Sequence, residues 1–114
     1  MAECLFCRIV AKEIPSKVVY EDKQVLAFHD INPAAPVHVL IVPKQHRTSL
    51  LDVTPDDQAV LGHLQLVAGQ LARELGLEER GFRLVSNCGE EGGQTIGHLH
   101  FHLLGGRTLQ WPPG

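Results

Sequence analysis

The sequence has 114 residues, 44% of them hydrophobic, and a formal net charge of −3 at pH 7, which suits one ordinary globular domain spanning residues 1–114. An excess of 13 acidic over 10 basic side chains argues against a protein that works mainly by binding nucleic acid or anionic membranes. No apolar run approaches the length of a membrane span, and MAECLFCRIV lacks the layout of a signal peptide, so we expect a cytoplasmic protein.

The N-terminal half predicts one short helix followed by three strands. Residues 4–12 (CLFCRIVAK) place apolar side chains at helical spacing and precede Pro15, so we expect a short helix that ends near Glu13. β-Branched and apolar runs predict the strands VVYE (18–21), QVLAFHD (24–30) and VHVLIVP (37–43). The last run is apolar almost throughout, which is typical of a central strand buried on both faces.

The longest predicted element is a helix that begins after Thr54, an N-cap residue followed by Pro55 at the first helical position. Apolar residues then recur every three or four positions up to Gly76, which is a favourable C-terminal stop. Gly62 and Gly69 lie seven residues apart inside this helix and therefore share a face. This predicts close packing of that face against a neighbouring element.

Two further strands complete the predicted sheet. FRLVSN (82–87) is the first, GHLHFHLLGG (97–106) contains the second, and the glycine-rich loop GEEGGQTIG (89–97) joins them. The order of helix, three strands, long helix and two strands lacks the regular alternation of a doubly wound sheet. Short turns between the first three strands favour antiparallel pairing. The prediction is an α+β domain with a five-stranded, mostly antiparallel sheet, one short helix and one long helix.

His98, His100 and His102 alternate with apolar residues in the last predicted strand. Strand geometry puts such positions on one face, about 6.6 Å apart along the chain. Three interpretations of such an imidazole face compete. It is a chance feature of an exposed surface, a binding site for Zn²⁺ or Fe²⁺, or a site where imidazole attacks phosphorus as a nucleophile. The third reading is chemically sound because neutral imidazole is a competent nucleophile near pH 7.

The glycine-rich loop before this strand favours phosphate chemistry. Backbone N–H groups around Gly92, Gly93, Gln94 and Thr95 can bind an anion. The side chains of Gln94, Thr95 and Asn87 add further hydrogen-bonding groups. Glycine also lets the backbone approach a phosphate without a Cβ in the way. A site that served only a metal would not need this loop.

The segment GGQTIGHLHFHLLGG resembles the signature of the histidine triad (HIT) family, His-φ-His-φ-His-φ-φ with φ apolar, which residues 98–104 match in full. FCRIVAKEIPSKVVYED resembles the family's N-terminal helix and first strand, and LAFHDINPAAPVHVLIVPKQH resembles its nucleoside-binding hairpin and central strand. The C-terminal GGRTLQWPPG resembles the Hint branch, the purine nucleoside phosphoramidases, in its bacterial type. The resemblance implies a HIT-like fold and a homodimer whose two sheets join into ten strands.

The resemblance also implies roles for individual residues. His100 would be the nucleophile that takes up the nucleotidyl group, and His102 would contact the phosphate. His98 would hold the geometry of the triad, and His46 would be a fourth histidine near the site. The residues implied to bind the phosphate or the leaving group are Asn87, Gly93, Gln94 and Thr95. Those implied to hold the nucleoside are Phe28, His29, Asp30 and Ile31.

The pair Cys4-x-x-Cys7 points to a possible structural zinc site. Two cysteines are half of a zinc site, and some members of the family complete it with two histidines, which here would be His46 and His98. The alternative is two small residues packed on a helix. An odd count of three cysteines argues against a disulfide framework. His38 and His63 are expected to have structural roles. Cys88 and Trp111 are expected to be packed, Trp111 at a dimer interface.

The expected function is hydrolysis of purine nucleoside 5′-monophosphate derivatives, above all phosphoramidates such as AMP-amide. The reaction would pass through a nucleotidyl-histidine and would need no catalytic metal. The expected partners are a purine nucleotide such as AMP and a second copy of the chain. Three alternatives stay open: a dinucleoside polyphosphate hydrolase, a nucleotide-binding protein with little turnover, and a zinc-dependent enzyme that uses the triad directly.

Overall fold

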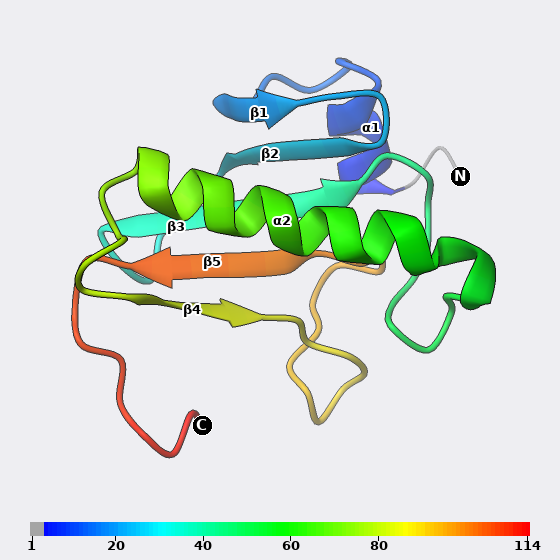
Figure 1. Cartoon of the computed structure of the whole chain (residues 1–114). Coiled ribbons are helices and arrows are strands. Elements are labelled where there is room, and N and C mark those ends of the chain that lie inside the picture. Colours follow the sequence, from blue (N-terminus) through cyan, green and yellow to red (C-terminus); the bar gives the residue numbers. More distant parts are fainter. Residues whose placement is uncertain (1–3) are drawn as a thin grey trace.

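The structure is a computed structural model that describes residues 4–114, in which a five-stranded sheet lies between two helices (Figure 1). Its elements are α1 (Leu5–Val10), β1 (Val18–Glu21), β2 (Val25–His29), β3 (Val37–Pro43), the 3₁₀ turn η1 (Pro55–Asp57), α2 (Gln58–Glu74), β4 (Phe82–Val85) and β5 (Phe101–Gly105). The strand order is β1-β2-β3-β5-β4, with all neighbours antiparallel. The predicted α+β fold is therefore confirmed, although α1, β2 and β4 end sooner than their sequence patterns predict. Within residues 4–114, no helix is long and apolar enough to cross a membrane.

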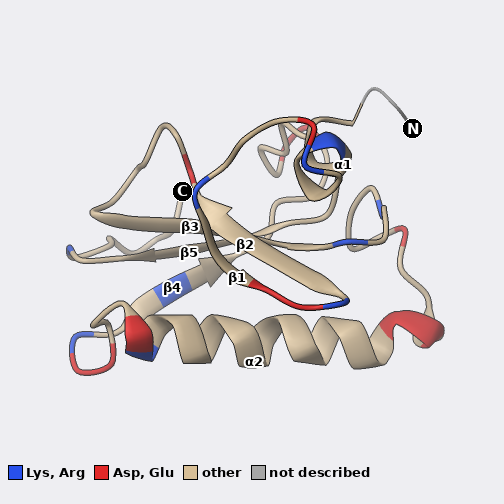
Figure 2. Cartoon of the chain, turned by 90° about the horizontal axis from the view of Figure 1, so that it is seen from above, with Lys and Arg blue, Asp and Glu red and all other residues tan. Residues whose placement is uncertain are grey.

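The two helices cover opposite faces of the sheet, as the view from above shows (Figure 2). Val25 and Ala27 of β2 belong to the apolar cluster under α2. Leu26 and Phe28, which alternate with them, belong to the cluster under α1. Residues 39–42 of β3 divide in the same way, and all four are buried. The prediction of a central strand buried on both faces is confirmed.

The predicted signals at the two ends of the long helix are confirmed. Thr54 and Asp57 form a capping box over η1, and α2 continues from that turn. Gly76 follows the helix with a φ of 80°, a left-handed conformation that favours glycine. The packing prediction for Gly62 and Gly69 is wrong within the chain, because no neighbouring atom lies within 4 Å of a Cβ placed at either position. That face of α2 points away from the sheet.

The predicted histidine strand forms only from Phe101 onward. The pairing of β3 with β5 ends at Ile41 and Phe101. Further pairing would reach Pro43, which has no N–H to donate. His98 and His100 therefore lie in the segment that precedes β5 and are not held to a common strand face.

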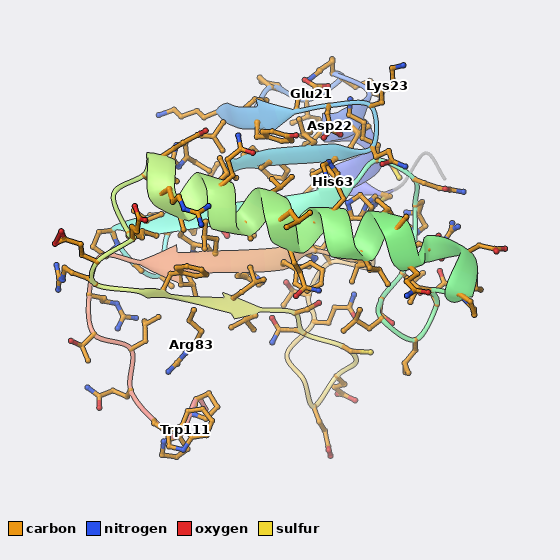
Figure 3. The ribbon with its side chains drawn as sticks, in the orientation of Figure 1. Glu21, Asp22, Lys23, His63, Arg83 and Trp111 are labelled. Atoms are coloured by element: carbon orange, nitrogen blue, oxygen red, sulfur yellow. The ribbon has the colours of Figure 1, made fainter. Side chains whose placement is uncertain are left out.

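A hydrogen-bonded cluster fastens the turn between β1 and β2 to α2 (Figure 3). Asp22 accepts from His63 of α2 at 2.6 Å, from the hydroxyl of Tyr20 at 2.7 Å and from the backbone N–H groups of Gln24 and Val25 at 2.8 Å each. Burial alone would raise the pKa of Asp22, but these hydrogen bonds outweigh it and hold the pKa well below its usual value. His63 thus has a structural role, as predicted.

Candidate active site

His98 is completely buried, and each of its ring nitrogens has a defined role. Its Nε2 lies 2.9 Å from the backbone carbonyl oxygen of Pro43. A carbonyl oxygen only accepts, so Nε2 carries the proton and Nδ1 keeps the lone pair. That lone pair faces the sulfur atoms of Cys4 and Cys7, at 3.3 and 3.6 Å. His98 therefore belongs to a cysteine-containing cluster on the α1 side of the chain.

His100 is oriented as a nitrogen nucleophile. Its Nδ1 lies 2.7 Å from the backbone carbonyl oxygen of His98, so Nδ1 donates and Nε2 keeps its lone pair. The hydroxyl of Ser86 donates to the carbonyl of His100 at 3.0 Å. The ring of Phe6, from α1, meets the imidazole edge-on with 5.0 Å between ring centres. Sequence reasoning singled out neither Ser86 nor Phe6 for this role.

His102 is hydrogen-bonded to His38, which we expected to have only a structural role. Its Nδ1 lies 2.9 Å from Nε2 of His38, on the neighbouring strand β3. The backbone N–H of Ala34 donates to Nδ1 of His38 at 3.0 Å, so the proton of His38 resides on Nε2 and points at His102. His102 must then carry its own proton on Nε2, where it can donate to an anion. Asp30 lies beside this pair, with Oδ2 3.4 Å from Nε2 of His38.

Burial favours the neutral form of His102, His38 and His98 at pH 7. It lowers the pKa of His102 to about 4, with smaller contributions from His100 and His38. It also lowers the pKa of His38, against the attraction of Asp30, and the pKa of His98. A neutral imidazole offers one lone pair and one N–H, so each ring can act as acceptor on one side and donor on the other.

An open cavity of about 820 Å³ adjoins the His38 side of this site. Three of the four residues predicted to hold a nucleoside line it, namely His29, Asp30 and Ile31. The side chain of Ile31 is 91% exposed, which makes an apolar surface available to a ligand. Phe28 instead packs beneath the surface at 4% exposure, with its ring centre 5.6 Å from that of Phe6, and its contact with a base stays a prediction.

The glycine-rich loop is held by its own side chains. The amide of Asn87 donates to the carbonyl of Gly92 at 2.6 Å. Gln94 accepts from the N–H of Gly89 and donates to the carbonyls of Thr48 and Ile96. Gly93 has a φ of 81°, a left-handed conformation that favours glycine. The amide groups of Asn87 and Gln94 thus shape the loop, while phosphate binding by the loop, including the exposed Thr95, stays a prediction.

Cys4, Cys7, His46 and His98 place their sulfur and nitrogen atoms together, and we call them the cysteine–histidine cluster. Nδ1 of His46 lies 3.2 Å from Nδ1 of His98 and 3.2 Å from Sγ of Cys7. A tetrahedral zinc ion with bonds of about 2.0–2.3 Å separates its ligand atoms by about 3.3–3.8 Å. Zinc-binding histidines usually donate their other ring N–H to an acceptor, and the Nε2–H of His98 does so to the carbonyl of Pro43. The donor set therefore fits Zn²⁺.

The structure also changes which histidine stands fourth beside the triad. His46 was expected there, but its Nδ1 faces Cys7 and His98 in the cysteine–histidine cluster. His38 takes the place beside His102. His38 and His102 are 64 positions apart in the sequence. Their contact could have been predicted only from the pairing of β3 with β5, which places them diagonally on one face of the sheet.

The fold and the site together define a small α+β protein with clustered histidines, one presenting a lone pair and another an N–H donor. A HIT domain model matches residues 11–109, and the chain belongs to this family. An uncharacterized HIT-like protein of Synechocystis sp. is 54% identical over 115 residues, covering 100% of both chains.

Solved structures of similar proteins agree with this fold. A HIT family hydrolase from Legionella pneumophila has a TM-score of 0.96 and 52% identity, covering 98% of this chain and 100% of the other. A histidine triad protein from Clostridium difficile has a TM-score of 0.93 and 46% identity, covering 96% of each chain.

Proposed function

We propose that the chain hydrolyses purine nucleoside 5′-monophosphate derivatives, with phosphoramidates such as AMP-amide as its substrates. The observation that supports this most directly is the hydrogen bond from Nδ1 of His100 to the carbonyl of His98, which leaves the lone pair of Nε2 for attack. The similarity to the Legionella protein described as a HIT family hydrolase supports the assignment to hydrolases.

The proposed reaction has two steps. Nε2 of His100 attacks the α-phosphorus, an N–P bond to the enzyme forms as the P–N bond of the substrate breaks, and the amine departs with a proton from solvent, which the water of the second step later returns. The Nε2–H of His102 donates to a phosphate oxygen and stabilises its charge. Water then attacks the nucleotidyl-histidine, which releases the nucleoside monophosphate and restores the imidazole. The nucleoside would lie over Ile31 in the open cavity, with its ribose hydroxyls donating to Asp30.

A substrate panel tests this proposal. We expect the enzyme to turn over AMP-amide faster than diadenosine polyphosphates. A chelator should leave the turnover of AMP-amide unchanged. His100→Ala should abolish this turnover, whereas the distant control His63→Gln should keep it. Mass spectrometry of quenched enzyme should show a nucleotidyl adduct on His100. Preference for diadenosine polyphosphates would favour the second hydrolase reading. Tight AMP binding without turnover would favour a binding protein, and loss of activity with chelator that Zn²⁺ restores would favour a zinc-dependent enzyme.

We further propose that the cysteine–histidine cluster holds a structural zinc ion that takes no part in the reaction. The distances from Nδ1 of His98 to Cys4, Cys7 and His46 are 3.3, 3.6 and 3.2 Å, near those between tetrahedral zinc ligands. His98 is also in the tautomer that leaves Nδ1 for a metal. Metal analysis of the purified protein should find zinc, which Cys7→Ser should lose. Cys88→Ser is the matched control, because Cys88 lies outside the cluster and its thiol donates to Ser49. Equal zinc content in both variants would contradict the assignment.

The proposed functional unit is a homodimer with a continuous ten-stranded sheet. β4 forms one edge of the sheet, where a second copy can pair with it. α2 carries no Lys, Arg, Asp or Glu between residues 58 and 72 (Figure 2), and Leu66 on this helix is 74% exposed. Trp111 is 80% exposed (Figure 3), which leaves it free to pack on a second copy. Light scattering should report a dimer that Leu66→Glu weakens. Leu51→Glu, at a leucine that is 87% exposed and lies outside α2, serves as the control. An unchanged dimer in Leu66→Glu would argue against α2 as interface.

A further inference from the structure

A second group of side chains has metal-ligating atoms in proximity. The donor atoms of Asp30, His38 and His102 all lie within 4.8 Å of one another. Nε2 of His38 is 2.9 Å from Nδ1 of His102 and 3.4 Å from Oδ2 of Asp30. By residue type and distance, this group resembles the two-histidine, one-carboxylate sites that hold divalent metals. Distance alone therefore does not distinguish it from the cysteine–histidine cluster.

The group behind each histidine does distinguish the two clusters. A histidine that binds a metal through one nitrogen carries its proton on the other and donates it to an acceptor. His98 meets this requirement, because a carbonyl oxygen, that of Pro43, lies behind it. His38 has the opposite arrangement, because an N–H group, that of Ala34, donates to its Nδ1. A proton on Nδ1 would leave two donors facing each other at 3.0 Å in a buried place.

We propose that the backbone N–H of Ala34 locks His38 in the Nε2–H tautomer, which excludes metal from the second cluster and directs the proton of His38 at His102. Arg107 is the positioning residue for this lock, since its Nε and Nη2 donate to the carbonyl of Ala34 at 3.2 and 2.9 Å. The lock makes His102 an acceptor at Nδ1 and therefore a donor at Nε2, the nitrogen available to phosphate. This last consequence rests on the proposed function, whereas the exclusion of metal does not.

Nitrogen NMR of histidine-labelled protein reads the tautomer without any substrate, because protonated and unprotonated ring nitrogens have well-separated shifts. In the full chain, Nδ1 of His38 should be unprotonated and Nε2 protonated at pH 7. Addition of excess ZnCl₂ should leave both signals in place and bring the bound zinc to one per chain, held by the cysteine–histidine cluster. A protonated Nδ1 in the unmodified protein, or zinc that shifts the signals of His38 and His102, would overturn the proposal.

Two variants remove the lock in different ways. Ala34→Pro deletes the N–H, so His38 should reach the other tautomer, and excess zinc should now bind the second cluster and inhibit. Because this variant can fail to fold, Arg107→Gln provides an independent test in which the backbone stays intact. It should give mixed tautomers, a kcat about tenfold lower and a smaller change in KM. Arg107→Lys, which keeps one donor for the carbonyl, should recover part of the kcat.

The two failures are distinguishable. If AMP-amide is not turned over but Nδ1 of His38 is unprotonated and zinc leaves it unchanged, the proposed function fails and the lock stands. If Arg107→Gln binds no extra zinc, keeps one His38 tautomer and has normal kcat, the assignment of Arg107 is wrong.

Discussion

Gly92→Ala should damage catalysis through the shape of the glycine-rich loop. A Cβ at Gly92 would overlap the carbonyl oxygen of Cys88 and lie 3.0 and 3.1 Å from the nitrogen and carbonyl carbon of the same residue. These are backbone atoms, so no side-chain rotation relieves the contact. To restore van der Waals separation the loop must move by about 1 Å, and a misplacement of that size can cost about 100-fold in rate. The carbonyl of Gly92 would move with it and weaken its 2.6 Å hydrogen bond from Asn87.

The assay is kcat/KM for AMP-amide, with thermal unfolding measured in parallel. Gly97→Ala is the matched control in the same loop, since no neighbouring atom lies within 4 Å of its added Cβ and its φ is not in the left-handed region. We expect a fall of about 100-fold in kcat/KM for Gly92→Ala, near-normal kcat/KM for Gly97→Ala, and similar unfolding temperatures for both. Wild-type turnover in Gly92→Ala would refute a role for the loop in positioning the phosphate.

Two other substitutions test the stability of the fold, and a third tests the packing of α1 against the site. Asp22→Asn should lower the free energy of unfolding by about 1–3 kcal/mol at pH 7. The fold lowers the pKa of this carboxyl, so the carboxylate stabilises the folded state fully above the unfolded pKa of about 4. That stabilisation is lost as the pH falls below this value. The free energies of unfolding of Asp22→Asn and wild type should therefore converge in acid and not in base. Gly105→Ala should destabilise by about 1–3 kcal/mol, as its Cβ would lie 2.7 Å from both methyl carbons of the buried Leu77, and an unchanged melting temperature would show that Leu77 repacks freely. Phe6→Leu removes the edge-on contact with His100 and should lower single-turnover rates by about 3- to 10-fold, whereas equal rates would mean that the ring does not orient the nucleophile.

Local features of the chain could be predicted from neighbouring residues alone. The N-cap residue Thr54, Pro55 after it and the stop at Gly76 act within one helical turn, so their identity was enough to place the long helix. The apolar run at 37–43 predicted a strand buried on both faces. A continuous apolar run gives this prediction whichever elements cover the two faces. The limits of the histidine strand were harder to predict, since they depend on the missing N–H of Pro43 in another strand.

The roles of the individual histidines could not be predicted from the local sequence pattern. By itself the sequence determined that His98, His100 and His102 belong to one segment and, through their resemblance to a known signature, that His100 is the central group. Only the tertiary structure gave each ring its tautomer, because a proton's position depends on the group behind the ring. That group is a carbonyl behind His98 and His100, and for His102 it is His38, 64 positions away. The packing of α1 and β3 around this segment, not the spacing of two, decides which imidazole faces sulfur, which keeps a free lone pair and which keeps a free N–H.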